Sequence, residues 1–280
     1  MRNIITSITI LFLFNFINAQ ECKFLSIDNE FEEGEIAYLF GNNVRLRTEP
    51  TSESETLVLL KIGQRIEIIE KTDVNNIFNG VESPWYKVKY DEKIGYILGG
   101  LISLIEVKDD NLRCFISFEK TEGKLYILTR VLSDLQNDYF ENKSEFFGDN
   151  YGFCLKLFDN KGLDGINNIL YINYLPESGG ANSGGYYLFF DKKKLHKVID
   201  VTSRSDIGLW ESENLYFPKD SLGAKNKIIY IKEKGEYSES NSEESEPNWE
   251  QSSKIILRLK WKDNKLIPNP RAFKSKEIKI

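Results

Sequence analysis

The fold of the first part of this chain is decided by four stretches, NVRLRTEP (residues 43–50), TLVLLKIGQRIEIIEK (56–71), SPWYKVKY (83–90) and KIGYILGGLIS (93–103). Within them apolar residues alternate with charged or polar ones, as in strands that bury one face. Pro50 ends the first stretch and Gly63 lies within the second, both at turn positions. The pattern predicts a small β-barrel over residues 36–106.

The order and spacing of the four stretches resemble the bacterial SH3 family. Its V-x-V-R-x-x-P opening, middle turn glycine, W-x-x-V strand and G-[WY]-[IV] ending are matched by Val44, Leu46, Arg47, Pro50, Gly63, Trp85, Val88, Gly95, Tyr96 and Ile97. Two segments depart from the family. Residues 73–82 are predicted to form an enlarged loop between the second and third strands, and Leu98–Gly100 is unusually rich in glycine for a closing turn.

The resemblance implies recognition. Domains similar to this one occur on exported bacterial proteins, where many bind cell-wall peptides or proteins. Small barrels bind through exposed aromatic and polar groups at one edge. The candidate ligand-binding residues are therefore Arg47, Glu49, Trp85, Tyr86 and Tyr96. The alternative is that each of these residues has a structural role, and for each one we favour it over ligand binding. Trp85 would then be partly buried in the barrel, and Arg47 would make a structural hydrogen bond.

The first nineteen residues have the layout of a secretory signal peptide. Arg2 precedes an apolar run from Ile4 to Phe16, and small Ala19 stands before polar Gln20. We expect cleavage after Ala19 and export to the periplasm or the medium. As a membrane anchor the stretch is too short and too often interrupted.

The residues after the signal peptide include a polar lead-in and three cysteines, and export affects how the cysteines are interpreted. Residues 20–35 are polar and acidic, which predicts a flexible lead-in. Cys22 is an unfavourable site for lipidation because Glu21 stands where lipoprotein signals have a small residue. Disulfides are permitted in an exported protein, and Cys114 and Cys154 both lie in apolar, strand-like segments. A Cys114–Cys154 disulfide is therefore one possibility, and two buried thiols are the other.

Charge disfavours two classes of partner. The chain has 37 basic and 43 acidic residues, a net charge of −6, and loss of the signal peptide with its single arginine leaves 36 against 43, or −7. An acidic surface disfavours nucleic acid and anionic lipid. After the signal peptide no apolar stretch is long enough to span a membrane, so we expect a mature protein without a membrane span.

A polar break at Lys108–Asn111 separates the barrel from residues 111–280, which read as a β-rich domain of unknown type. The predicted fold class is mainly β, with the barrel followed by a larger antiparallel domain, either a meander or propeller-like. Turns ending in Lys-Leu at residues 124, 194 and 265 suggest an internal repeat. The slightly favoured alternative is that lysine-rich hairpin turns look alike.

Residues 237–251 are acidic, rich in serine and poor in apolar side chains, which predicts an exposed loop. Asn160 and Asp164 lie in a segment that resembles the acidic turn of calcium-carrying propeller repeats. They are weak metal candidates, because calcium requires six to eight oxygen ligands and this segment supplies few carboxylates. A plain turn is the better interpretation.

The chain has one histidine, His196, which excludes a zinc site built from several imidazoles. No cofactor is expected. The resulting hypothesis is an exported, non-catalytic binding protein of the bacterial cell envelope whose partner is a cell-wall peptide or an envelope protein. The alternative is a carboxylate-based hydrolase with an SH3-type targeting module, because two carboxyls across a cleft can hydrolyse glycosidic bonds.

Overall fold

The computed structural model describes residues 22–133, 138–148, 152–176, 180–206, 208–238 and 248–273. The expected signal peptide, residues 1–19, lies outside the described residues. Within these ranges strands predominate, and none of the helices is long and apolar enough to cross a membrane.

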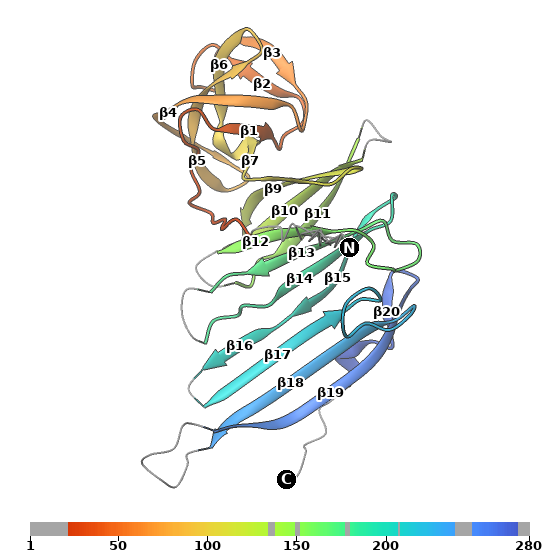
Figure 1. Ribbon diagram of the computed structural model, residues 1–280. Helices are drawn as coiled ribbons and strands as arrows, with labels where there is room; N and C mark the ends of the chain where they lie inside the picture. The colour runs from red at the N-terminus through yellow and green to blue at the C-terminus, as the bar shows by residue number, and fades with distance from the viewer. Residues whose placement is uncertain are drawn as a thin grey trace, which may run out of the picture.

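The first module is a barrel made from one curled sheet at one end of the molecule (Figure 1). Its elements are β1 (Ile36–Leu39), β2 (Val44–Arg47), β3 (Thr56–Leu60), β4 (Arg65–Phe78), β5 (Val81–Tyr90), β6 (Lys93–Leu98), the 3-10 helix η1 (Gly99–Leu101) and β7 (Ile102–Ser103). The sheet order is β3-β2-β6-β5-β4-β1-β7. Alternate residues such as Leu46, Ile66, Val88 and Ile97 point inward and form the barrel core. The predicted small barrel is therefore confirmed.

The enlarged loop expected over residues 73–82 is instead a long hairpin. Pairing of β4 with β5 continues to Phe78 and Val81, and the tip is Asn79 and Gly80, with φ of 51° and 72°. Positive φ at both central residues is what a two-residue hairpin turn of type I′ requires. The tip reaches the next sheet, where the backbone N–H of Lys120 donates to the Asn79 carbonyl at 2.8 Å. We call this hairpin, residues 71–86, the arm.

The rest of the chain forms three antiparallel meanders. The first sheet contains β8 (Glu106–Lys108), β9 (Leu112–Thr121), β10 (Lys124–Ser133) and β11 (Tyr139–Glu145). The middle sheet contains β12 (Phe153–Phe158), β13 (Asn168–Tyr174), β14 (Gly185–Phe190) and β15 (Leu195–Val201). The third contains β16 (Ser203–Asp206), β17 (Leu209–Tyr216), β18 (Ile228–Ser238), β19 (Asn248–Lys262) and β20 (Lys265–Ile267), and the 3-10 helix η2 (Pro270–Ala272) follows.

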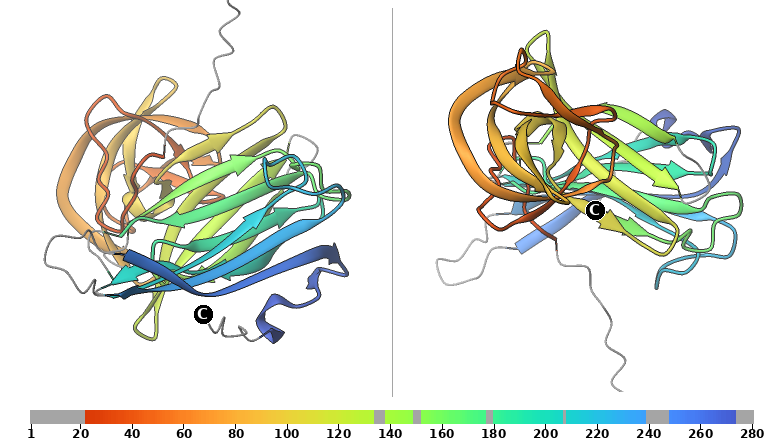
Figure 2. Two further views of the ribbon diagram at one scale, coloured as in Figure 1. Left: turned by 60° about the horizontal axis from the view of Figure 1, so that its bottom comes forward. Right: turned by 90° about the horizontal axis from the view of Figure 1, so that it is seen from above.

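The three sheets follow one another away from the barrel (Figures 1 and 2). One face of the middle sheet, including Leu170 and Tyr186, shares a core with the first sheet. Its other face, including Ile169 and Phe189, shares a core with the third sheet. The predicted antiparallel β domain is thus confirmed, and its middle sheet is buried on both faces.

The barrel is packed onto the first sheet. Phe40 and Ile62 of the barrel form an apolar cluster with Phe115 and Leu128. The Arg130 guanidinium stacks 4.2 Å from the centre of the Phe40 ring and donates to the Phe40 carbonyl at 2.7 Å. Apolar contact and hydrogen bonds at the same place fix the barrel against β9 and β10.

The expected break at Lys108–Asn111 is a hairpin turn inside the first sheet. Asp109 Oδ1 accepts hydrogen bonds from the backbone N–H groups of Asn111 and Leu112, both at 2.9 Å, and β8 pairs with β9 on either side. An aspartate that bonds the backbone ahead of it makes a turn as readily as a linker. The barrel therefore ends at Ser103, and β8 belongs to the second part.

The lead-in was expected to be flexible, but its described residues are packed. Leu25 is fully buried and exchanges two backbone hydrogen bonds of 2.9 Å with Phe153 at the edge of the middle sheet. This brings Cys22 beside Cys154, and the two form a disulfide with a Cα–Cα distance of 5.5 Å. The Cys114–Cys154 pairing is thus wrong, because Cys114 lies on β9 of the first sheet and remains a free, buried thiol.

The loop predicted over residues 237–251 is shorter than expected. β18 extends to Ser238 and β19 starts at Asn248, and residues 239–247 lie outside the described residues.

The three Lys-Leu turns lead into strands at different positions in their sheets. They precede β10, β15 and β20, which are the third, fourth and fifth strands of their sheets in chain order. Because these positions are not equivalent, the similarity reflects hairpin turns and not a repeated unit.

Candidate functional site

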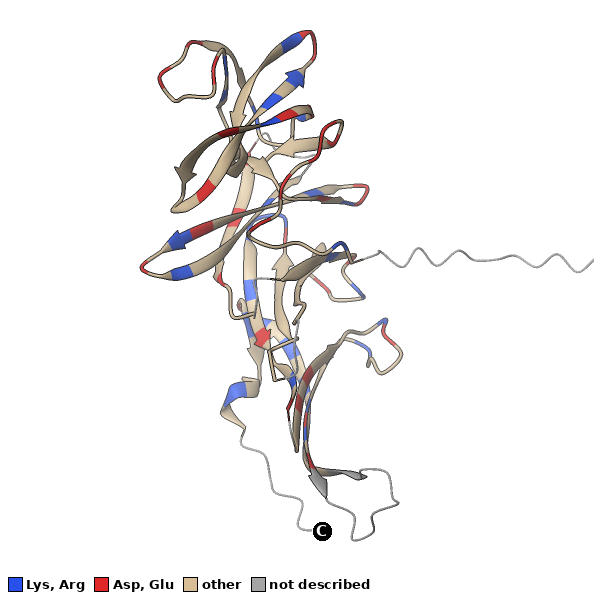
Figure 3. Cartoon of the chain, turned by 90° about the vertical axis from the view of Figure 1, so that its left-hand side faces the viewer, with Lys and Arg blue, Asp and Glu red and all other residues tan. Residues whose placement is uncertain are grey.

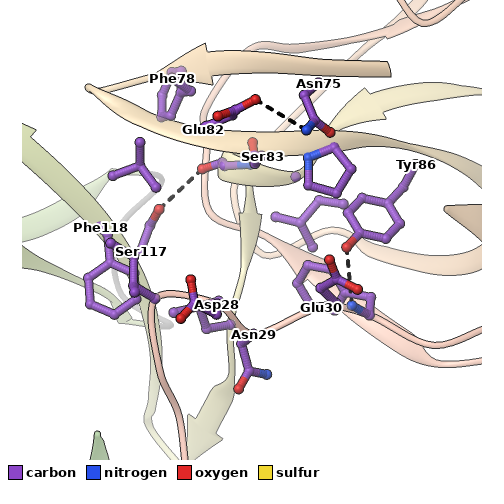
Figure 4. A pocket seen from close by; sticks show the side chains of 18 of the residues that line it. Asp28, Asn29, Glu30, Asn75, Phe78, Glu82, Ser83, Tyr86, Ser117 and Phe118 are labelled. Carbon is purple, nitrogen blue, oxygen red and sulfur yellow. Dashed lines mark hydrogen bonds between the residues drawn. The ribbon is translucent and has the colours of Figure 1, made fainter. Parts of the chain in front are cut away.

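A pocket of about 340 Å³ lies where the barrel, the lead-in and the first sheet meet (Figure 4). Residues 27–31 of the lead-in form one side, the arm forms the opposite side, and β9 closes the end. We call it the junction pocket. It exists because the arm crosses from the barrel to Lys120 and because the disulfide and the Leu25 pairing hold the lead-in in place.

Part of the lining of the junction pocket is apolar. Its apolar side chains include Ile27, Phe78, Val81, Leu104 and Phe118. Phe118 packs edge-on against Phe153, with ring centroids 5.7 Å apart, so this part of the lining rests on the core shared by the first and middle sheets. An apolar lining with a few polar groups is the usual composition of a ligand site.

Two serines line the pocket on either side of one glycine. Ser83 Oγ accepts a hydrogen bond from the Gly100 backbone N–H at 2.9 Å, and Ser117 Oγ donates to the Gly100 carbonyl at 3.1 Å. Both hydroxyls are therefore held in place by the chain that closes the barrel. This gives the glycine-rich turn at Leu98–Gly100 a structural role, because a Cβ at Gly100 would lie 3.0 Å from Phe78.

Carboxylates outnumber cations in the pocket lining. Asp28, Glu30 and Glu82 face a single Lys71. The Lys71 ammonium pairs with Glu30, and this hydrogen bond raises the pKa of Lys71. Glu82 Oε1 accepts from the Asn75 amide at 3.2 Å on the arm. The pocket therefore favours a ligand with a positively charged group.

One of the predicted site residues, Tyr86, lies at the pocket. Its ring is buried and packs edge-on against Phe31, with centroids 5.3 Å apart, and its hydroxyl oxygen accepts from the Phe31 backbone N–H at 3.2 Å. Burial raises the pKa of Tyr86, so the hydroxyl keeps its proton and can donate it in a hydrogen bond.

Three other predicted residues, Arg47, Trp85 and Tyr96, gather elsewhere, on the side of the barrel sheet that points away from the barrel core. Arg47 pairs with Tyr96 across β2 and β6, and Trp85 lies on β5 beside Leu98 of β6. The structural interpretation holds for two of them: Trp85 is only 4% exposed, and Arg47 Nη1 donates to the Ser54 carbonyl at 2.6 Å. Glu49 stands apart, exposed in the turn between β2 and β3.

Most of the junction pocket is missed by sequence reasoning. Asp28 and Asn29 come from the segment predicted to be flexible, and Ser117 and Phe118 come from the second part. The available signal is that three large apolar residues, Leu25, Ile27 and Phe31, interrupt an acidic segment, which indicates packing.

The other chemical candidates are held in structural contacts. His196 Nε2 lies 2.9 Å from Asp191 Oδ2, and its ring packs edge-on against Trp261. Asn160 Oδ1 accepts from the Gly162 backbone N–H at 2.9 Å and so forms a turn, while Asp164 is exposed. Across the described ranges, no group of three or more histidine, cysteine, aspartate or glutamate side chains could hold a metal ion.

Comparison with protein families assigns one part of the chain. Residues 42–103 match the family model described as bacterial SH3 domain, so this segment is a bacterial SH3 domain, in agreement with the resemblance of its four strand motifs. No curated protein and no solved structure gave a significant match to the chain.

Proposed function

We propose that this protein is an exported, non-catalytic binding protein of the bacterial cell envelope. Its bacterial SH3 domain supports a role in binding cell-wall material or protein. We propose that the ligand is a cell-wall peptide or a peptide segment of an envelope protein, held in the junction pocket. The observation that carries this proposal is the pocket itself, built from the SH3 domain, the lead-in and β9.

The lining of the junction pocket suits a peptide with a free amino group. The volume of about 340 Å³ is at the lower end for small-ligand sites and accommodates one long side chain with part of its backbone. The apolar residues of the lining would contact the aliphatic part of that side chain, and the carboxylates of Asp28 and Glu82 would attract its ammonium group. Asn29 and Asn75 offer amide groups for peptide hydrogen bonds.

The test is retention on insoluble cell-wall peptidoglycan. Asn75→Trp places a bulky ring at the pocket rim, whereas Asn76→Trp places the same ring on the opposite face of β4; both positions are exposed. We expect Asn75→Trp to abolish most of the retention and Asn76→Trp to leave it unchanged. Equal retention of the two variants would show that the pocket does not hold the ligand.

These point variants are preferable to removal of the barrel. Without the barrel, Phe115 and Leu128 of the first sheet would lose their contacts with Phe40 and Ile62, and the exposed apolar surface would confuse the result.

The hydrolase alternative has its own test. Asp28 and Glu82 lie on opposite sides of the junction pocket (Figure 4), an arrangement that carboxylate chemistry would use. We expect no release of soluble fragments from wall material by the purified protein. Release that Asp28→Asn or Glu82→Gln abolishes would contradict the non-catalytic proposal and favour the hydrolase.

A further inference from the structure

The side of the barrel sheet that points away from the barrel core carries a second group of charged, aromatic and aliphatic side chains. Arg47, Tyr96 and Lys87 lie in one row across β2, β6 and β5, because Arg47 pairs with Tyr96 and Tyr96 pairs with Lys87. Neighbouring side chains in such a row are about 5 Å apart. We call this surface the outer face; its members are Arg45, Arg47, Leu59, Trp85, Lys87, Lys89, Ile94 and Tyr96.

The outer face carries four cationic side chains, Arg45, Arg47, Lys87 and Lys89. Acidic and basic residues are spread over the chain (Figure 3), which has a net charge of −6. Among the described residues, no ion pair involves Arg45, Arg47, Lys87 or Lys89. The acidic neighbours within the sheet lie on β4, where Glu67 is opposite Lys89 and Glu70 is opposite Lys87, and no residue of the pairing β3 strand opposite Arg45 or Arg47 is acidic. Cations that form no close ion pair, two of them opposite uncharged residues of β3, favour an anionic partner on this acidic protein.

The outer face is also apolar and hollowed. Leu59 is 58% exposed and Ile94 is 52% exposed. Beside them a hollow of about 250 Å³ is lined by Arg45, Arg47 and Trp85 together with residues 42–44 and Leu101. The Trp85 indole N–H is buried and has no acceptor among the described residues. Buried hydrogen-bond donors normally have an acceptor. The Trp85 N–H is thus an unpaired donor in the wall of this hollow.

The edge of the same sheet is open to another chain. The strand order places β3 at the end of the barrel sheet, next to β2, and Leu59 of β3 stands beside Arg45. An edge strand can pair with an extended peptide through backbone hydrogen bonds. β2, β3 and β6 lie at the end of the molecule away from the stacked sheets (Figure 1), so the first sheet does not cover them.

We propose that the outer face docks an acidic, extended peptide segment of a partner protein. Arg45, Arg47 and Lys87 pair with its carboxylates, Leu59 contacts its aliphatic side chains, and β3 offers backbone hydrogen bonds. The outer face is separate from the junction pocket, so this binding does not depend on the wall-peptide proposal.

The probe is a fluorescent ten-residue peptide that alternates Glu and Val, with a Gln–Val peptide as its uncharged control and polyphosphate as a non-peptide polyanion. We expect the purified protein to bind the Glu–Val peptide at low salt, with affinity about tenfold or more above that for the Gln–Val peptide. Raising the salt to 0.5 M should remove most of this difference, because surface charges are screened.

The double variant Arg45→Glu/Lys87→Glu should weaken binding of the Glu–Val peptide by about tenfold or more. The matched control is Lys61→Glu/Lys93→Glu, which makes the same change of charge at exposed positions off the outer face, and it should change the affinity less than about threefold. Unchanged thermal unfolding of both double variants establishes that they are folded. Asn75→Trp should still bind the peptide, which separates this surface from the junction pocket.

Three results would overturn the proposal: equal binding of the Gln–Val and Glu–Val peptides by the wild-type protein, equal loss in the two double variants, or polyphosphate binding as tightly as the Glu–Val peptide. The last result would identify a general polyanion surface. The first comparison needs no variant, so it holds even if one variant fails to fold.

Discussion

The SH3 domain buries one face of its strands, whereas the middle sheet buries both faces. In the barrel the inner residues of each strand form a closed core, and the outer face meets solvent around Arg45, Leu59 and Ile94. In the middle sheet both faces are covered, with Tyr186 in one core and Phe189 in the other. The two proposed binding surfaces therefore lie on the barrel and at its junction with the first sheet, while the middle sheet is a two-sided core of the stack.

The largest expected effect comes from the middle sheet. Phe189 is fully buried and packs edge-on against Phe217 and Trp261. Phe189→Ala should lower the free energy of unfolding by about 3 to 5 kcal/mol, whereas Leu59→Ala on the outer face should change it by less than about 0.5 kcal/mol. Urea unfolding monitored by circular dichroism measures both. Equal effects would mean that the middle sheet is not a two-sided core.

The third sheet should make stability depend on pH through one buried carboxylate. Glu213 is 3% exposed and accepts hydrogen bonds from Arg271 at 2.6 Å, Lys232 at 2.8 Å and Tyr230 at 3.0 Å. Burial alone would raise the pKa of Glu213, but the bonds from Arg271 and Lys232 lower it from 4.5 to about 2.

Because the folded-state pKa is the lower one, Glu213 contributes its full stabilisation above pH 4.5 and loses it as the pH falls toward 2. A shift of this size corresponds to about 3 kcal/mol. Urea unfolding between pH 6 and pH 3 should therefore show a smaller loss for Glu213→Gln than for the wild type. Glu236→Gln, at an exposed position of the same sheet, should behave like the wild type; a wild-type slope for Glu213→Gln would contradict the assignment.

The smallest expected effect tests the contact between the SH3 domain and the first sheet. A Cβ at Gly80 would lie 2.0 Å from the Lys120 carbonyl oxygen, whereas a Cβ at Gly34 would meet no atom within 4 Å. Both glycines have positive φ, of 72° and 81°, so alanine strains the backbone at either position by about 1 kcal/mol. Gly80→Ala should cost about 1 kcal/mol more than Gly34→Ala in thermal unfolding, and equal losses would mean that the arm is not docked on β9.

The same contrast explains what the sequence predicts and what it does not. The barrel strands alternate apolar and polar residues and are joined by turn residues such as Gly63, so their fold and family are readable. In β14 the run GYYLFF is almost continuously apolar, because both of its faces are buried, and such a run does not show which sheets it lies between. The sequence of the arm predicts a loop because Asp73, Asn75 and Asn76 have low strand propensity, whereas the structure pairs it as a hairpin.

The candidate site was only partly predictable for a related reason. Tyr86 is part of a recognisable strand motif, but Asp28 and Ser117 reach the junction pocket through pairings distant in the sequence. The disulfide shows the same limit: Cys22 meets Cys154 because Leu25 pairs with Phe153, and the spacing of cysteines does not reveal that register.

The most direct test of the junction pocket is amide chemical-shift mapping of the isotopically labelled protein with a soluble cell-wall stem peptide that carries a free amino group. We predict saturable shifts at the backbone amides of Phe31, Gly100 and Ser117, which line the pocket, and loss of these shifts in Asn75→Trp. Shifts confined to β17 and β18 of the third sheet, or no shifts at a concentration at which the protein is retained on peptidoglycan, would contradict binding in the junction pocket.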